Sequence, residues 1–392
     1  MRSVVTVSRD LFVKTEFQKY WVDKLESHKD LLQKHTEEND INSQFPYENI
    51  NWLIQEGYTK MVLPKSFGGD GATAEDIIIF QETLGKIDSA TALAIGWHMG
   101  VVGQVYEDKL WNQSLLDEFA KEILNGAVVN RAVSEADTGS PTRGARPSTN
   151  AKRCGESYKI NGVKTFTSMS KRLTHFLVGA YIPEQEAMGF FLVPKEAVGL
   201  SIADNWNMVG MRATESHDLV LDDVIVHEKY LVEISKGPRG SKPNLWMLHI
   251  PAVYLGIAQA ARDYAIDFAN EYSPGSIEGV IADIPAVEHN IGNMELELTS
   301  ARHYLYSVAD LYMNPPITEE RIDIEIGVAK SIVVNHAIKI IDIAMRIVGA
   351  KSLEMERPLQ RYYRDVRAGL HNPPMDDVTL SKLAKKALNE RK

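Results

Sequence analysis

The chain has 392 residues, of which 44% are hydrophobic and 24% are charged. This length exceeds what one hydrophobic core usually serves, so we expect two or three regions with separate cores, and the composition excludes a disordered or fibrous chain. Lys and Arg total 43 against 53 for Asp and Glu, and the resulting formal charge of -10 argues against a nucleic-acid partner.

Cysteine usage and hydropathy limit the cellular compartment that we expect and the kinds of metal site that are possible. Cys154 is the only cysteine, so an intrachain disulfide and a cysteine-based zinc cluster are both excluded. Residues 1–10 lack the apolar run of a secretory signal, and no stretch approaches the roughly 20 apolar residues of a membrane span. We therefore expect a soluble, cytoplasmic protein with no membrane span and no metal site.

The N-terminal region, residues 1–129, is predicted to be a helical domain. Apolar residues recur at helical spacing between Phe17 and Leu124, first at Trp21 and Leu25 and again from Ile77 onward. Between these helices the segment 64–71 contains three glycines and a proline, which predicts a tight loop.

Residues 130–236 are predicted to form a middle β domain. Short runs rich in Val, Ile, Thr and Phe alternate there with turn residues, as in antiparallel strands. The clearest case is the segment 158–166, whose apolar residues alternate around Asn161-Gly162, a pair favoured in two-residue hairpin turns.

Residues 237–392 are predicted to be a C-terminal helical bundle that follows a linker over 235–243. Three long helical patterns are present, and the last, 324–349, has a broad apolar face. Part of this apolar surface could be covered by another subunit, so we expect a homo-oligomer, a tetramer or a dimer.

Five segments resemble the acyl-CoA dehydrogenase family and follow one another in the order typical of it. They are Pro64–Gly71, Ala132–Ser140, Asn161–Ser168, Val209–Ser216 with Leu221–Val224, and Arg361–Asp365. Each is weak alone, whereas together they cover nearly the whole chain. The resemblance implies an α+β fold with an N-terminal α-helical domain, a middle antiparallel β domain and a C-terminal four-helix bundle.

The same resemblance implies a flavin site. The residues that match cofactor-binding positions are Val133, Ser134, Gly139, Ser140, Phe166 and Ser168. Small hydroxyl residues can hydrogen-bond a flavin without blocking the substrate, and Phe166 stands where the family usually has a stacked Trp. Taken singly, Ser134 and Ser168 would be interpreted as strand-end residues and Phe166 as core. The resemblance also places Ser140 and Trp246 beside the substrate.

Further residues of these segments carry weaker assignments. Arg212 and Ser216 belong to the fourth segment and are weaker candidates for the site. Arg364 and Asp365 are interpreted as a structural ion pair or a helix-end contact, since charged pairs serve the scaffold more often than the chemistry.

The catalytic base of the family has no counterpart at its usual place. Dehydrogenation needs a carboxylate to remove the α-proton, and the position where the family has Glu is Pro373 here. The alternative position, near the start of the first bundle helix, is assigned to Trp246. The segments 271–285 and 346–350 also lack the family's adenylate-binding pattern, so FMN is an alternative to FAD.

A second branch of the superfamily, which includes dibenzothiophene monooxygenase, is similar at these departures. The resemblance lies in 91–98, 249–256 and 364–373, and it implies catalytic roles for His371 and His98 together with Ser168 in oxygen chemistry at a reduced flavin. A buried, hydrogen-bonded histidine is the competing interpretation, above all for His98. Asp376 and Asp377 are possible displaced bases or simple helix-capping residues.

Three functions therefore remain open. The first is FAD-dependent α,β-dehydrogenation of an acyl-CoA thioester, with electron-transfer flavoprotein as partner. The second is a reduced-flavin (FMNH2) monooxygenase for a small organic substrate, which implies a flavin reductase. The third is a flavoprotein scaffold without turnover.

Overall fold

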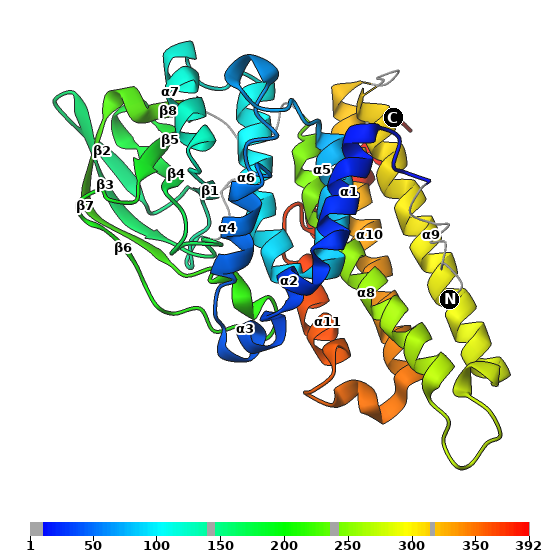
Figure 1. Cartoon of the computed structure of the whole chain (residues 1–392). Helices are drawn as coiled ribbons and strands as arrows, with labels where there is room; N and C mark the ends of the chain where they lie inside the picture. Colours follow the sequence, from blue (N-terminus) through cyan, green and yellow to red (C-terminus); the bar gives the residue numbers. More distant parts are fainter. Residues whose placement is uncertain (1–10, 139–145, 236–242, 314–317, 392) are drawn as a thin grey trace.

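The computed structural model describes residues 11–138, 146–235, 243–313 and 318–391. Figure 1 shows a β-sheet on one side of the molecule and long helices on the other, with α6 between them. The three-part α+β architecture expected from the resemblance is confirmed. No helix within these ranges is long and apolar enough to cross a membrane.

The N-terminal part consists of helices, as predicted. They are α1 (Glu16–Ser27), α2 (Lys29–Gln33), α3 (Thr36–Asn42), α4 (Tyr47–Gln55), α5 (Ala74–Ile87), α6 (Ser89–Glu107) and α7 (Gln113–Leu124). Side-chain caps fix where the longest of them begin: Thr73 forms a capping box with Asp76 at α5, and Asp88 accepts the Thr91 N–H at α6. The glycine-containing segment 64–71 is a loop, as predicted, with one short 3-10 turn at Lys65–Phe67.

The middle part is one sheet. Its strands are β1 (Val129–Ala132), β2 (Asn150–Cys154), β3 (Ser157–Lys164), β4 (His175–Ile182), β5 (Ala187–Pro194), β6 (Leu200–Ile202), β7 (Leu219–His227) and β8 (Leu231–Ser235). The order is β6-β7-β3-β2-β4-β5-β8, with β1 paired to β4.

The expected all-antiparallel pairing is wrong at two places. Strand β1 pairs with β4 in parallel, and β2 also meets β4 in parallel at Asn150 and Tyr181. Hydrophobic alternation reports that a segment is a strand but not the direction of its partner. Because β1 and β4 are separated by two other strands, no hairpin turn dictates their direction.

The hairpin turn predicted at Asn161-Gly162 is also wrong, because both residues lie inside β3. The turn lies instead between β2 and β3, where Gly155 has a φ of 62°. The register of β3 against β7 shifts between Ile160 and Gly162, which marks a bulge. A Cβ on Gly162 would lie 2.3 Å from Thr149 Oγ1, so the glycine serves a close approach rather than a turn.

The C-terminal part has three long helices and two shorter ones. They are α8 (His249–Glu271), α9 (Pro285–Met313), α10 (Glu319–Val348), α11 (Pro358–Val366) and α12 (Asp376–Asn389). Helix α8 packs directly on α5, and glycines allow the two backbones to approach. A Cβ on Gly256 would lie 2.3 Å from Glu82 O, and one on Gly85 would lie 2.6 Å from Val253 O. This backbone contact joins the N-terminal helices to the bundle.

Candidate functional site

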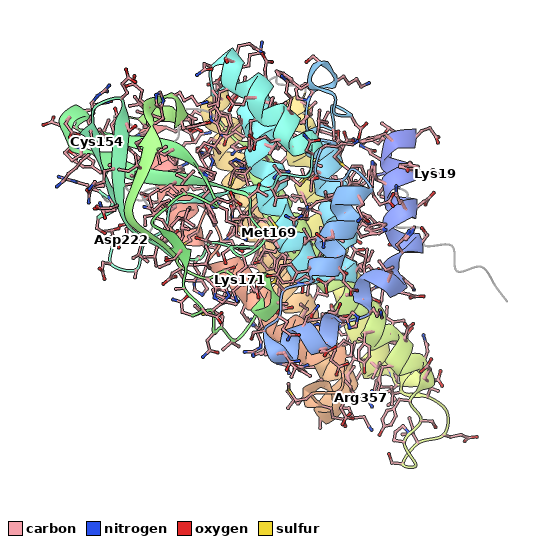
Figure 2. All side chains as sticks on the ribbon, turned by 60° about the vertical axis from the view of Figure 1, so that its left-hand side comes forward. Lys19, Cys154, Met169, Lys171, Asp222 and Arg357 are labelled. Carbon is pink, nitrogen blue, oxygen red and sulfur yellow. The ribbon has the colours of Figure 1, made fainter. Side chains whose placement is uncertain are left out.

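Two loops of the middle part cross where the sheet meets the helices. One follows β3, the other precedes β7, and we call residues 165–170 and 211–217 together the cradle. Backbone N–H groups of the first loop donate to carbonyl oxygens of the second: Thr167 to His217 at 3.3 Å, Met169 to Thr214 at 2.9 Å and Ser170 to Glu215 at 3.3 Å. In Figure 2, Met169 lies between the sheet and the helices, whereas Cys154 lies at the opposite edge of the sheet.

Four non-glycine residues of the cradle have left-handed backbone. They are Phe166, Met169, Met211 and Glu215, with φ between 41° and 64°. Such conformations are uncommon for residues with bulky side chains, and they concentrate at binding and catalytic sites where surrounding contacts maintain them. The cradle is therefore the strongest candidate for a ligand site on geometric grounds.

The cradle fits the flavin that the resemblance implies. The buried hydroxyl groups of Thr165 and Thr167 have no hydrogen-bond partner within the described residues, although buried polar atoms normally have one. Phe166 is 58% exposed, and its ring meets Trp206 edge-on, with ring centroids 6.1 Å apart. An exposed aromatic face beside unused hydroxyl groups suits a planar polar ring system.

The end of β1 joins the cradle through its backbone. Ser134 O accepts the Thr165 N–H at 2.9 Å, and Val133 O accepts from Lys164 Nζ at 3.4 Å. These contacts bring the predicted residues Val133, Ser134, Phe166 and Ser168 into one region of the fold. The remaining two cofactor candidates, Gly139 and Ser140, lie outside the described residues.

A buried ion pair, which no sequence motif indicated, fixes β3 to the segment that follows β1. Lys164 Nζ lies 2.7 Å from Glu135 Oε1, and both side chains are almost fully buried. Burial alone would raise the pKa of the Glu135 carboxyl, but hydrogen bonds from Lys164, Thr149, Ser148 and Thr138 hold it well below its ordinary value. Glu135 therefore stays ionised and ties β3 to the segment that follows β1.

Both ring nitrogens of His98 form hydrogen bonds with backbone groups. His98 is fully buried on α6; its Nε2 lies 3.1 Å from Thr59 O, and its Nδ1 accepts the Val129 N–H at 3.1 Å. Burial lowers the pKa of His98 to about 4, so the ring is neutral, with its proton on Nε2. A catalytic role for His98 stays a prediction, and these two hydrogen bonds disfavour it because they leave no ring nitrogen for a ligand.

The segment after α11 places His371 at the surface. The His371 side chain is exposed, and its neighbour Asn372 accepts a hydrogen bond from the buried Tyr254 hydroxyl of α8. At the expected base position, Pro373 offers no proton acceptor in its side chain. Asp376, one of the possible displaced bases, contacts the buried Lys330 amine at 3.4 Å and accepts from Asn335 at 3.0 Å.

Trp246 lies in the short turn that precedes α8 and packs against α6. A Cβ on Gly103 would fall 2.4 Å from the indole ring, and the indole N–H donates to the carboxylate of Glu107. Burial raises the pKa of Glu107, against the opposing effect of this hydrogen bond. A carboxylate that the sequence motifs did not indicate, Glu107, therefore lies beside Trp246, the residue assigned to the alternative base position, and accepts its hydrogen bond.

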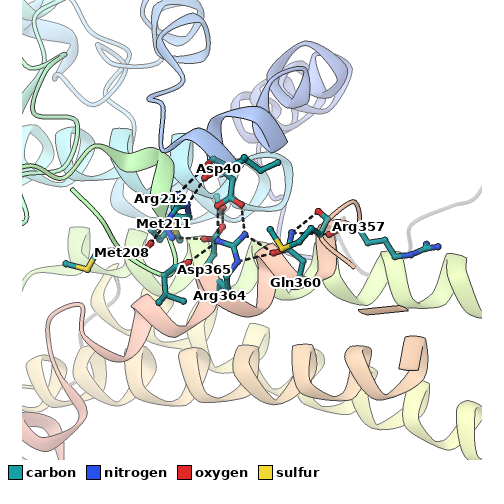
Figure 3. Close-up of polar contacts among 12 residues, drawn as sticks. Asp40, Met208, Met211, Arg212, Arg357, Gln360, Arg364 and Asp365 are labelled. Atoms are coloured by element: carbon teal, nitrogen blue, oxygen red, sulfur yellow. Dashed lines mark hydrogen bonds and ion pairs between the residues drawn. The ribbon is translucent and has the colours of Figure 1, made fainter. Parts of the chain in front are cut away.

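A polar junction joins the cradle to the N-terminal and C-terminal helices (Figure 3). Arg364 of α11 forms an ion pair with Asp40 of α3 and donates to Val209 O at 2.9 Å. Arg212 donates to Asp40 O at 2.7 Å. The structural role expected for Arg364 agrees with these contacts, but Arg364 pairs with Asp40 rather than with its neighbour Asp365. Arg212, a weaker candidate for the site, contacts backbone carbonyl oxygens of α3.

Asp365 accepts two hydrogen bonds at the same junction. Its carboxylate accepts from Ser89 Oγ of α6 at 2.7 Å and from the Met211 N–H of the cradle at 2.6 Å. Burial raises the pKa of Asp365 from 3.8 to about 6, and the charge of Asp40 adds to this shift while the two donors oppose it. The Asp365 carboxylate thus connects Met211, whose backbone is left-handed, to α11 and to α6.

Asp365 predicts a specific dependence of stability on pH. Its folded-state pKa is raised, so the folded protein binds the proton more tightly, and this stabilisation is lost as pH rises from about 4 to about 6. The loss is at most about 3 kcal/mol, and Asp365→Asn should abolish it because the amide does not titrate. Urea unfolding of both proteins across this range measures it; a pH-independent difference between them contradicts the assignment.

No cluster of metal-ligating side chains is present within the described ranges.

Family models for the N-terminal, middle and C-terminal domains of acyl-CoA dehydrogenases match residues 26–108, 130–224 and 248–372. YdbM of Bacillus subtilis (strain 168), which carries the provisional name acyl-CoA dehydrogenase, is 52% identical over 377 residues, covering 96% of this chain and 99% of YdbM.

Two solved structures show the same fold at low sequence identity. KijD3 in complex with FMN and a dTDP-linked amino keto sugar superposes with a TM-score of 0.84 at 22% identity, covering 96% of this chain and 94% of KijD3. A glutaryl-CoA dehydrogenase from Mycobacterium smegmatis in complex with FADH2 gives a TM-score of 0.85 at 18% identity, covering 97% of this chain and 96% of that one.

Proposed function

This chain belongs to the acyl-CoA dehydrogenase family, and from that premise we propose that it is a flavin-dependent oxidoreductase acting on an acyl-CoA thioester. The observation that supports a flavin is the cradle, with its left-handed backbone, the exposed side chain of Phe166 and the buried hydroxyl groups of Thr165 and Thr167, which have no partner in the part of the chain that the structure describes. The nominal reaction is oxidation of the Cα–Cβ bond, which the identity to YdbM supports.

In this proposal, each residue of the site has a distinct role in binding the flavin or in supporting the cradle. A bound flavin would supply the hydride acceptor. Phe166 would stack on the ring, Ser168 would donate a hydrogen bond to its polar edge, and Ser134 would offer a further hydroxyl from the end of β1. Glu135 and Asp365 act behind them, since each holds one side of the cradle through buried hydrogen bonds. Electron-transfer flavoprotein is the proposed electron acceptor.

A second candidate is favoured by the surroundings of Pro373. Dehydrogenation requires a proton acceptor beside the substrate, yet Pro373 is apolar and Asp376 is held by Lys330 and Asn335. A reduced-flavin monooxygenase acting on a small organic molecule needs no such carboxylate. His371, exposed on the same segment, would then act as a hydrogen-bond donor and proton carrier, with a flavin reductase as partner.

One experiment separates these candidates. We would release and weigh the cofactor of the purified protein, then titrate the flavin-loaded protein without oxygen with butyryl-, octanoyl- and palmitoyl-CoA. Bleaching of the oxidised flavin spectrum with formation of the enoyl product establishes dehydrogenation. Absence of bleaching, together with substrate-dependent oxygen uptake by the reduced protein, establishes the monooxygenase. Failure to bind either FAD or FMN overturns the flavin proposal.

His371 gives the matched test of the second candidate. Because its side chain is exposed, His371→Ala should leave the unfolding free energy within ~0.5 kcal/mol, so a loss of turnover cannot be assigned to misfolding. Loss of oxygen-dependent turnover of about a hundredfold is expected for a proton-transferring group. Unchanged turnover in this variant removes His371 from the mechanism.

A further inference from the structure

Three buried hydroxyl groups form a hydrogen-bonded chain that ends at Ser168. Thr214 Oγ1 lies 2.8 Å from Ser216 Oγ, and Ser216 Oγ donates to Ser168 Oγ at 2.8 Å. All three side chains are almost completely buried. This hydrogen-bonded chain runs from the second loop of the cradle to the first, so it connects the two loops through side chains as well as through the backbone.

The geometry of the contact between Ser216 and Ser168 assigns Ser216 as the donor. Each hydroxyl has one proton and can accept further hydrogen bonds. Ser216 gives its proton to Ser168, while Thr214 also lies within donating distance of Met211 O, at 2.9 Å. The proton of Ser168 therefore points elsewhere, and within the described residues no acceptor lies in reach of it. A buried donor without an acceptor is rare and normally marks a missing partner.

Backbone contacts hold Ser168 on its other side. Its carbonyl oxygen accepts from Asn130 Nδ2 of β1 at 3.3 Å, and its N–H donates to Phe166 O at 3.1 Å. Ser168 thus has a fixed main chain and one filled acceptor site on its hydroxyl, while its O–H has no acceptor among the residues that the structure describes.

We propose that Ser216 is a positioning residue that makes Ser168 a directed hydrogen-bond donor to the flavin. By filling an acceptor site of Ser168, Ser216 excludes the rotamers in which the Ser168 proton would point back into the cradle. Donation from Ser216 also polarises the Ser168 hydroxyl and strengthens the bond that it donates, as in other buried hydrogen-bond chains. This inference rests on the proposed function, since it needs a flavin as the acceptor.

A double-mutant cycle on flavin binding tests the proposal. Apoprotein would be titrated separately with FAD and with FMN, for the parent chain, Ser168→Ala, Ser216→Ala and the double variant. Ser168→Ala should weaken binding about tenfold, the usual effect of one good hydrogen bond. Ser216→Ala should weaken it roughly threefold, and the double variant should bind no more weakly than Ser168→Ala, because Ser216 acts through Ser168.

A second readout separates positioning from a general structural role. The reduction potential of the bound flavin should shift in the same direction in Ser216→Ala and Ser168→Ala, and Ser216→Thr, which keeps a hydroxyl, should restore the parent value. Ser170→Ala is the matched control. It removes another buried hydroxyl that joins the same loops, from Ser170 to Glu215 O at 2.8 Å, without touching Ser168. Its effect on flavin affinity should add to that of Ser168→Ala.

The possible results distinguish failure of this inference from failure of the proposed function. If the effects of Ser216→Ala and Ser168→Ala add, or if only Ser168→Ala moves the potential, Ser216 is a scaffold residue and the proposal is overturned. If the parent chain binds neither flavin, the proposed function fails and this inference fails with it. That result is visible before any variant is made.

Discussion

Glu135→Ala should lower the free energy of unfolding by about 3–5 kcal/mol, which is the usual cost of leaving a buried charge without its partner. Lys164 would remain almost fully buried, where burial already lowers the pKa of its amine. The backbone N–H groups of Ser148 and Thr149, 2.7 and 3.0 Å from the carboxylate, would also lose their acceptor. Urea unfolding at neutral pH, followed by circular dichroism, measures this loss.

Two controls show whether the buried charge is responsible. Glu135→Gln combined with Lys164→Met removes both charges but keeps an acceptor for the backbone, and it should recover most of the lost stability. Glu228→Ala breaks the ion pair with Arg153, whose side chains are 48% and 43% exposed, and should cost less than ~1 kcal/mol. A loss in Glu135→Ala no larger than that in Glu228→Ala contradicts the assigned role of the buried pair.

Arg364→Ala should destabilise the protein by about 3 kcal/mol and loosen the cradle at the same time. Asp40, whose side chain is 7% exposed, would lose its counter-ion, and Val209 O would lose a donor. Since Arg364 joins α11 to both α3 and the loop before β7, the effect should reach the cradle. Hydrogen exchange should rise at the N–H groups of Met169 and Ser170, which bond the second loop.

Arg367→Ala is the matched control for this prediction. Arg367 lies one turn further along the chain, and its ion pair with Asp342 has side chains 33% and 45% exposed. Its loss should cost no more than ~1 kcal/mol and should leave exchange in the cradle unchanged. Equal losses in the two variants, or an unchanged cradle in Arg364→Ala, would show that the junction does not support the site.

The cofactor residues were predicted because they stand in motifs, not because of their individual chemistry. Phe166 and Ser168 follow β3 directly, so a match in that segment was enough to place them together. Ser134 follows another strand, β1, and the structure joins it to the same loop through Thr165 N. Periodicity and turn propensity could not supply this, because the parallel pairing of β1 with β4 sets where Ser134 lies.

The histidines show what the sequence could not decide. His98 and His371 have the same chemistry and both stand in segments similar to the monooxygenase branch. In the structure, one is fully buried with both nitrogens bonded to the backbone, and the other is exposed. Burial and hydrogen-bond partners decide whether an imidazole can act on a ligand, and both depend on contacts between residues far apart in the chain.

Residue identity and pattern were enough to predict the order of helices, strands and helices, the family and the absence of a carboxylate side chain at position 373. These features depend on residue identity, local periodicity and motif order. The direction of β1, the bulge at Gly162, the pairing of Arg364 with Asp40 and the burial of Glu135 against Lys164 became visible in the folded chain alone. Each of these joins residues distant in sequence, and local propensity carries no information about such partners.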